Sequence, residues 1–195
     1  MTIKAPAIEA QILETFILLT LNHQSLIATK ANRIVRAAQG RPVLEFGSRR
    51  AQGADGAVKG ARAAYIGGCA GTACTLTDEL YQVPASGTMP HNAVLLVDTY
   101  NTLKSGVPNA IRVFKEMLVP QGITNFAIRL DSGDISYLSK QARKMLDEAG
   151  LTNCKIVASN ALDEHLIRDL LMQGAKVDVF GVGERMITSK SAPVF

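Results

Sequence analysis

The chain has 195 residues and a mass of 20.9 kDa, which is the size of one domain and leaves little room for two. Its 47% hydrophobic and 19% charged residues are typical of a packed globular protein and exclude a disordered chain. The cysteines lack the spacing of a disulfide framework or a zinc site, and the sequence has neither a signal peptide nor an apolar run of spanning length. We therefore expect a cytoplasmic protein without a membrane partner.

The net charge of +4 is concentrated in one part of the chain. Residues 32–62 contain seven Lys or Arg residues but only Glu45 and Asp55 on the acidic side. Aromatic residues make up 5% of the chain and Trp is absent, so a base-stacking surface for nucleic acid is not expected. This pattern favours a small anionic ligand, such as a phosphate, over nucleic acid.

The first half of the chain begins with helical spacing of apolar residues over about 7–39, with a kink expected near Asn22. A short apolar run at 43–46 predicts a strand, and an Ala-rich segment at about 55–66 predicts the helix that follows it. A second short strand is expected at 82–86. These elements form a strand, loop and helix unit with a further strand behind it.

From residue 93 onward, predicted strands and helices alternate regularly, with strands that are apolar almost throughout. Strands of this kind are buried on both faces of a parallel sheet, so the fold class is α/β, either a barrel or an open doubly wound sheet. The predicted strands are 93–98, 126–130, 155–158 and 176–180, and the predicted helices are 108–117, 135–148 and 163–173. Because polar or Gly-rich residues follow each strand, a barrel with its active site at the strand exits is favoured.

One connection is too short for this scheme. Only residues 87–92 separate the strand at 82–86 from the strand at 93–98, whereas a crossover between parallel strands needs a dozen or more residues. Either these two strands are not parallel neighbours, or a helix that belongs to the complete fold is absent from the sequence.

The strand exit at 45–50 combines Phe46 with Arg49 and Arg50. Arginine binds carboxylate or phosphate through a planar fork, and a phenyl ring stacks on a flat heteroaromatic ring. The alternative is a surface arginine pair beside a core phenylalanine, and the sequence alone leaves both readings open.

The strand exit at 129–134 places Arg129 and Asp131 on the same side of the chain, because side chains alternate along a strand. Such a pair suits a site that orients a phosphorylated sugar and stabilises a cation developing on it, and the alternative is a structural ion pair. Asp134 is expected to cap the next helix. The Gly181 and Gly183 loop could bind a phosphate through its backbone, but a plain turn is the better supported reading.

His91 lies in a loop of small residues, where it could act as a general base or a covalent phosphate carrier; a polar loop residue is the alternative. No histidine, cysteine and carboxylate cluster has the spacing of a transition-metal site, so no metal ligand is assigned.

Seven short blocks together resemble the nicotinate phosphoribosyltransferase family, in the order in which that family has them, over about residues 5–194. The blocks are residues 46–53, 63–68, 86–89 with His91, 97–100, 129–134, 158–160 and 181–183. The resemblance implies a type II phosphoribosyltransferase (β/α) barrel. It also implies transfer of a phosphoribosyl group from phosphoribosyl pyrophosphate to nicotinate, giving nicotinate mononucleotide and pyrophosphate in NAD salvage, with Mg²⁺, coupled ATP hydrolysis and a homodimer.

The same resemblance assigns roles to individual residues. It implies that Phe46 stacks on the pyridine ring, that Arg49 lies near the ring carboxylate and ribose, and that His91 is the histidine phosphorylated by ATP. The residues implied to surround the ribose, pyrophosphate and 5-phosphate are Asp98, Arg129, Asp131, Ser159, Asn160, Gly181 and Gly183.

The chain departs from the family between His91 and the next strand, where family members have a helical stretch, and Pro90 replaces a small residue. The family also has an N-terminal domain and further C-terminal residues, so the barrel is expected to be incomplete. Within it, residues 1–42 are interpreted as leading helices, 43–92 as first strands and substrate loops, and 93–195 as regular β/α repeats. The alternatives are a related quinolinate or nicotinamide phosphoribosyltransferase, or a truncated, non-catalytic module for phosphate binding or dimerisation.

Overall fold

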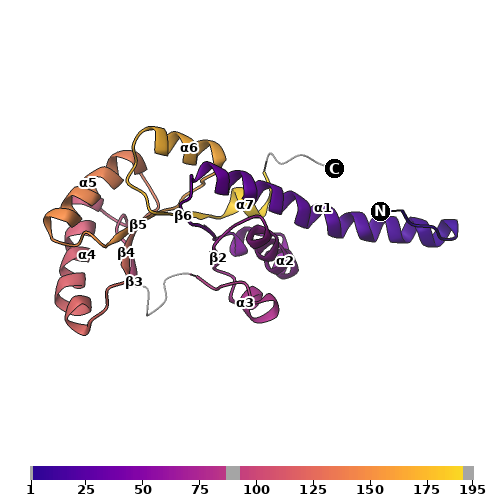
Figure 1. Ribbon diagram of the computed structural model, residues 1–195, viewed down its shortest axis with the longest axis horizontal. Coiled ribbons are helices and arrows are strands. Elements are labelled where there is room, and N and C mark those ends of the chain that lie inside the picture. The colour runs from indigo at the N-terminus through magenta and orange to yellow at the C-terminus, as the bar shows by residue number, and fades with distance from the viewer. Residues whose placement is uncertain (1, 87–92, 191–195) are drawn as a thin grey trace.

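The computed structural model describes residues 2–86 and 93–190, in which six parallel strands form one curled sheet, a half-barrel with helices on its outer side (Figure 1). The strand order is β2-β1-β6-β5-β4-β3. The strands are β1 (Val43–Glu45), β2 (Gly71–Thr72), β3 (Ala93–Leu96), β4 (Phe126–Leu130), β5 (Lys155–Ala158) and β6 (Val179–Val182). The predicted α/β class and the curvature expected of a barrel are therefore confirmed.

The helices alternate with these strands and cover the convex face of the sheet (Figure 1). They are α1 (Ala7–Ala37), α2 (Gly53–Ile66), α3 (Thr75–Tyr81), α4 (Val107–Val113), α5 (Ile135–Glu148), α6 (Glu164–Met172) and α7 (Glu184–Ile187). Helix α4 continues at both ends into single π-helical turns, Thr102–Gly106 and Phe114–Leu118. As expected, Asp134 caps α5 by accepting a hydrogen bond from the Tyr137 backbone N–H at 2.9 Å.

Strand β1 lies between β2 and β6, so the first and last strands of the described chain are direct neighbours. Val43 pairs with Phe180 and Glu45 with Val182, while β3 forms the opposite edge of the sheet. Among the described residues β2 and β3 are therefore the two edges, and the sheet is curled but not closed. The strand expected at 82–86 is reduced to one parallel bridge between Ala85 and Thr72, and the connection at 87–92 lies outside the described residues.

Strand β6 was expected at 176–180, but the ladder runs over Val179–Val182. Ala175 and Val177 precede the strand but are buried in the core beside the sheet. Their burial explains why the apolar sequence pattern begins before Val179. Phe180 donates its backbone N–H to the Pro42 carbonyl oxygen, so pairing with the β1 side fixes the register. Gly181 is consequently a strand residue and not part of the exit loop.

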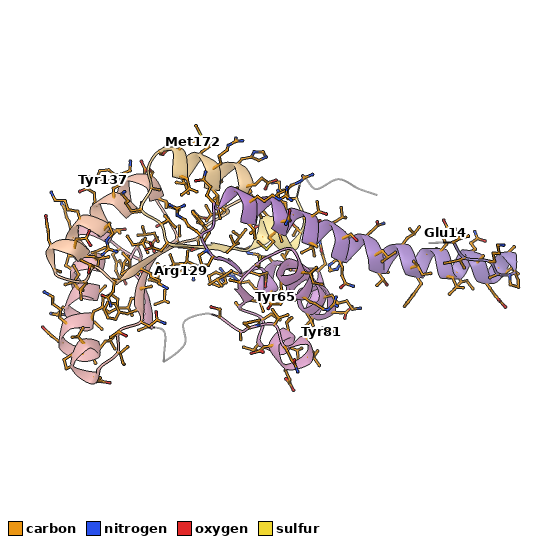
Figure 2. All side chains as sticks on the ribbon, in the orientation of Figure 1. Glu14, Tyr65, Tyr81, Arg129, Tyr137 and Met172 are labelled. Atoms are coloured by element: carbon orange, nitrogen blue, oxygen red, sulfur yellow. The ribbon has the colours of Figure 1, made fainter. Side chains whose placement is uncertain are left out.

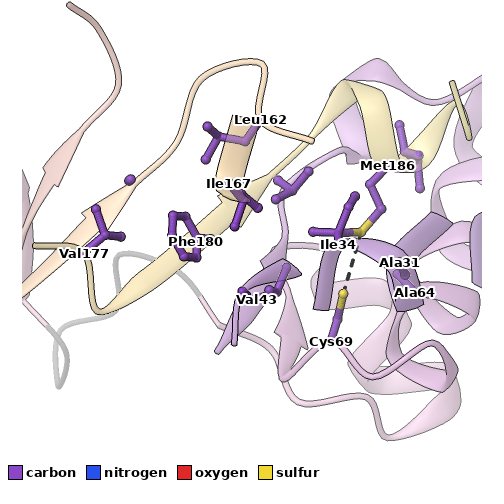
Figure 3. Packing of buried hydrophobic residues seen from close by; sticks show 14 of the residues in the cluster. Ala31, Ile34, Val43, Ala64, Cys69, Leu162, Ile167, Val177, Phe180 and Met186 are labelled. Atoms are coloured by element: carbon purple, nitrogen blue, oxygen red, sulfur yellow. Dashed lines mark hydrogen bonds between the residues drawn. The ribbon is translucent and has the colours of Figure 1, made fainter. Parts of the chain in front are cut away.

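Two buried clusters hold the helices on the sheet. In the first, Ile34 from α1, Phe180 from β6 and Met186 from α7 pack together, and the Cys69 thiol lies 3.7 Å from the Met186 sulfur (Figure 3). The second joins α4 and α5 to β3, β4 and β5, and the rings of Phe114 and Phe126 stack in it with centroids 4.6 Å apart. Burial of apolar side chains on the outer face therefore leaves the inner face of the sheet available for a site.

The first half of α1 projects beyond the rest of the molecule (Figure 1). Its apolar side chains are largely exposed: Ile8 by 77%, Phe16 by 70% and Leu19 by 71%. Packing against α2 and α6 begins near Ile27, which is 1% exposed, and the buried Lys30 ammonium pairs with Glu164 of α6 at 2.7 Å. None of the described helices is long and apolar enough to cross a bilayer.

Candidate functional site

The carboxyl ends of the strands meet at one rim of the half-barrel, because all six strands are parallel. Arg129 is the penultimate residue of β4, and Asp131 follows that strand. Asp98 follows β3, Ser159 follows β5 and Phe46 follows β1. Apart from Arg129 and Asp131, these residues are far apart in the sequence, but contacts in the fold bring them together. The rim is therefore the candidate active site.

Arg129 is the centre of this rim and lies on the inner side of the sheet (Figure 2). Its Nε donates to the Ser159 hydroxyl at 2.8 Å, and its Nη2 contacts the Asp131 carboxylate at 3.0 Å. The Ser159 hydroxyl in turn makes a short hydrogen bond to the same carboxylate. The ion pair that the sequence left open as an alternative is thus present, and it sets the orientation of the guanidinium.

Asp98 fixes the loop that follows Arg129. Its Oδ2 accepts hydrogen bonds from the Asp131 backbone N–H at 2.6 Å and from the Ser132 hydroxyl at 2.8 Å. Both bonds end on the same oxygen, and Oδ1 accepts none from the described residues. The Ser132 contact is not evident from the sequence, although Ser132 lies within one of the blocks that carry the family resemblance.

The Phe46 ring contacts both β6 and the Arg129 side chain. The guanidinium carbon of Arg129 is 5.5 Å from the ring centroid, a cation–π contact. The ring also occupies the space that a side chain on Gly181 would need, since a Cβ there would lie 2.5 Å from ring carbons. The Phe46 backbone N–H also donates to the Val182 carbonyl oxygen at 2.8 Å, so both the ring and its backbone are fixed.

A cavity of about 580 Å³ occupies the inside of the half-barrel below this rim. Phe46, Arg49 and Arg129 line it at the rim, whereas Leu44, Ala127 and Val157 supply apolar walls deeper inside. A pocket of this kind, apolar with a few convergent charged groups, is typical of small-molecule sites. Its two guanidinium groups favour an anionic ligand with a flat apolar part.

The loop between β5 and α6 has unusual backbone conformations. Asn160 and Ala161 have positive φ angles of 89° and 45°, which L-residues seldom adopt outside functional or turn positions. Asp163 then caps α6 through the backbone N–H groups of His165 and Leu166, and it also binds the Arg185 guanidinium. This ion pair connects the exits of β5 and β6, and no sequence pattern predicts it.

The remaining predicted residues lie outside this hydrogen-bonded group. Asn160 is exposed in the β5 exit, and Gly183 immediately precedes α7. His91 lies outside the described residues, so the structure does not relate it to the rim. Within the described ranges, no group of three or more His, Cys, Asp or Glu side chains could hold a metal ion by itself.

Comparison with solved structures assigns the half-barrel to the type II phosphoribosyltransferase fold. Human nicotinic acid phosphoribosyltransferase matches 92% of this chain with a TM-score of 0.78 at 25% identity, over 51% of its own length. Nicotinate-nucleotide pyrophosphorylase from Pyrococcus furiosus matches 88% of this chain with a TM-score of 0.71 at 30% identity, over 48% of its length. No protein-family model matches the chain.

Sequence comparison narrows the assignment. The chain is 48% identical over 214 residues to nicotinate phosphoribosyltransferase from Bacillus subtilis, a match that covers 99% of the chain. It is 43% identical over 210 residues to a nicotinate phosphoribosyltransferase from Mycobacterium tuberculosis, covering 97% of the chain. The chain is therefore a homologue of the nicotinate phosphoribosyltransferases. This confirms the family resemblance that the seven sequence blocks indicate.

The match covers only part of each relative's sequence. The chain spans 43% of the length of the Bacillus subtilis enzyme and 45% of the Mycobacterium tuberculosis enzyme. The first alignment also runs over 214 residues, which is more than the 195 residues of the chain. Part of the aligned stretch in that relative therefore has no counterpart here.

Proposed function

We propose that this chain contributes the phosphoribosyl-transfer site of a nicotinate phosphoribosyltransferase, which joins nicotinate to the ribosyl group of phosphoribosyl pyrophosphate. The observation that carries the proposal is the contact of Arg129 with both Asp131 and Phe46 at the rim of one cavity. A guanidinium beside a phenyl ring suits an anionic nucleotide with an aromatic base. The 48% identity to the Bacillus subtilis enzyme over nearly the whole chain supports the same substrate class.

In this reaction the pyridine nitrogen forms a bond to C1 of the ribose while the bond from C1 to the pyrophosphate oxygen breaks. Positive charge develops on the sugar and negative charge on the leaving pyrophosphate, so a site needs groups of both signs in fixed positions. In our proposal Arg129 contacts both the ribose and the pyrophosphate, so it also contributes to binding of the mononucleotide product, and Asp131 stabilises the sugar cation. Their mutual contact and the Ser159 hydroxyl keep both groups oriented before substrate arrives.

The nicotinate ring is proposed to bind against Phe46, with Arg49 neutralising its carboxylate, since both side chains line the cavity. The ribose 5-phosphate is proposed to lie at the exits of β5 and β6, near Ser159, Asn160 and Gly183. Gly181 has a different part in this arrangement. It makes room for the Phe46 ring from within β6.

Mg²⁺ and ATP belong to the proposal as cofactors. Magnesium is commonly bound by one or two carboxylates together with substrate phosphates, and Asp98 and Asp131 are the carboxylates available at this rim. When bound, Mg²⁺ would neutralise charge on the leaving pyrophosphate. His91 is proposed to accept the phosphoryl group of ATP, and a His91→Ala variant should then lose stimulation by ATP while keeping slow, ATP-independent transfer.

A second candidate function follows from the length of the match. The chain spans less than half of its curated relatives, and apolar residues on the first half of α1 are exposed. A non-catalytic module that binds nucleotide or dimerises would fit these facts. A homodimer and a cytoplasmic location remain part of the main proposal, the latter because the three cysteines are free thiols.

The test is a turnover assay of the 195-residue chain with phosphoribosyl pyrophosphate and Mg²⁺, with and without ATP. Nicotinate, nicotinamide and quinolinate are supplied in separate reactions, and the mononucleotide product is measured by mass spectrometry. The proposal expects product from nicotinate. Binding of nicotinate mononucleotide without turnover would favour the module, and exclusive use of nicotinamide would contradict the assigned substrate.

A further inference from the structure

The Glu45 carboxyl group is buried at the end of β1 with no exposed surface, and the mechanism above makes no use of it. Side chains alternate along a strand, so Glu45 points to the face opposite Leu44 and Phe46, which line the cavity. Burial raises the pKa of Glu45, whereas hydrogen bonds from the Thr72 hydroxyl and the Gly47 backbone lower it. A carboxyl group in such a place needs a structural reason, because burial without partners is costly.

The partners of this carboxyl group lie on two different strand exits. Oε1 accepts the backbone N–H of Gly47, and Oε2 accepts the Thr72 hydroxyl at 2.5 Å. The Thr72 oxygen in turn accepts the backbone N–H of Cys74 at 2.9 Å. One side chain therefore links the turn after β1 to the loop after β2.

This link acts on the segment that carries the proposed base-binding residues. The β1 ladder ends at Glu45, and the chain turns into the short helix Ser48–Arg50, so the buried Gly47 N–H has no strand partner to bond. Only a side-chain acceptor satisfies it, and an unsatisfied buried N–H would loosen the turn. Space is equally restricted there, because a Cβ on Gly47 would lie 2.6 Å from the Ile187 side chain.

We propose that Glu45 is a positioning residue for the base-binding end of the site, which holds Phe46 and Arg49 in place through Gly47 and Thr72. This inference rests on the proposed function, since it assumes that Phe46 and Arg49 bind the pyridine ring. It makes a specific statement about ligands. Loss of the link weakens binding of a nucleotide that carries the base but not binding of the sugar phosphate alone.

The variants are chosen to separate positioning from general stability. Glu45→Met removes both acceptor oxygens but keeps a side chain of similar length, whereas Glu45→Gln keeps one oxygen that can accept the Gly47 N–H. Thr72→Val removes one hydroxyl while keeping the shape of the side chain, and it provides the test if Glu45→Met does not fold. Thr77→Val is the matched control, because Thr77 is equally buried and its hydroxyl donates to the Val58 carbonyl oxygen, away from the turn.

The affinities of nicotinate mononucleotide and of ribose 5-phosphate are measured by calorimetry for each variant of the chain. We expect Glu45→Met and Thr72→Val to weaken the mononucleotide roughly fivefold to tenfold, with ribose 5-phosphate changed less than about twofold. Glu45→Gln should recover most of the loss. Amide hydrogen exchange in a peptide spanning 44–51 should accelerate in Glu45→Met and Thr72→Val but not in Thr77→Val.

Three results would overturn the inference. If Thr77→Val changes the ratio of the two affinities as much as Thr72→Val, Glu45 and Thr72 contribute only stability. If both ligands weaken together in every variant, the link does not act on the base-binding end. If the wild-type chain binds neither ligand, the proposed function fails first, and the positioning role fails with it.

Discussion

The guanidinium of Arg129 lies 5.5 Å from the centroid of the Phe46 ring, although two strands separate β4 from β1 in the sheet. The contact therefore crosses the mouth of the half-barrel. It brings together a cation from β4, next to the β3 edge of the sheet, and an aromatic ring from the end of β1, next to the β2 edge. The curvature of the sheet, and not proximity in sequence, creates the proposed site.

Replacement of Arg129 by alanine should abolish nucleotide binding with little effect on stability. Its side chain is 28% exposed and that of its ion-pair partner Asp131 is 38% exposed, so the free energy of unfolding should change by about 1 kcal/mol or less. Calorimetry with nicotinate mononucleotide measures the first effect and urea unfolding the second. Arg112→Ala, on the exposed side of α4, is the matched control. Near wild-type affinity in Arg129→Ala would contradict the assigned role.

Replacement of Gly181 by alanine should displace the Phe46 ring. The added Cβ would lie 2.5 Å from two ring carbons, and a strand in a parallel sheet cannot easily move away. We expect destabilisation of about 1–3 kcal/mol and weaker binding of the mononucleotide. Gly56→Ala is the control, because a Cβ there meets nothing closer than 3.8 Å and alanine favours the helix. Equal stabilities of the two variants in thermal unfolding would contradict this packing.

The Asp163 and Arg185 pair should make stability depend on pH in the acid range. Burial raises the pKa of Asp163, but the backbone N–H groups of Leu166 and His165 and the Arg185 guanidinium outweigh it and lower the pKa overall. A lowered carboxyl pKa gives stability that is present above the unfolded pKa of about 3.9 and is lost as pH falls through the folded value.

Asp163→Asn keeps the cap but removes the charge, so we expect it to cost about 1–2 kcal/mol at pH 7 and progressively less below about pH 4. Urea unfolding across this range measures the difference. Asp55→Asn, in the exposed pair with Lys59, should cost much less at pH 7 and change little with pH. A cost of Asp163→Asn that is the same at pH 3 and pH 7 would show that the pair does not contribute as described.

The three thiols should differ sharply in reactivity. Burial raises the pKa of Cys69 to about 12 and that of Cys154 to about 12, so neither forms a thiolate near neutral pH. Cys74 is only partly buried at the start of α3. A thiol-specific reagent should therefore modify Cys74 first in the native chain, and all three after denaturation. Rapid modification of Cys69 without unfolding would contradict the packing of the first core cluster.

The elements from β4 to α6 were predictable because their sequence signals agree with their environment. Strands Phe126–Leu130 and Lys155–Ala158 and helix Ile135–Glu148 have the predicted bounds. The strands are buried on both faces, and Asp134 marks the start of the helix as a cap. In contrast, β2 consists of only Gly71–Thr72, too short for a periodic signal, and neither it nor α3 was expected.

The sequence predicts which residues lie at the site but not which of them contact one another. Polar residues after successive strands indicate a shared rim, yet the sequence does not reveal that Arg129 reaches Phe46 across it. Glu45 shows the same limit, since a carboxylate beside Phe46 is easily interpreted as part of the rim. Only the alternation of the strand and the bond to Thr72 place it on the opposite face.

The central claim is that the cavity of this half-barrel binds a nicotinate nucleotide at the Arg129 and Phe46 rim. The most direct test is calorimetric titration of the 195-residue chain with nicotinate mononucleotide, with nicotinamide mononucleotide as the comparison. Our account predicts saturable binding of the nicotinate form, weaker binding of the nicotinamide form, which lacks the ring carboxylate, and loss of both in Arg129→Ala. Absence of binding, or binding that Arg129→Ala leaves unchanged, would contradict it.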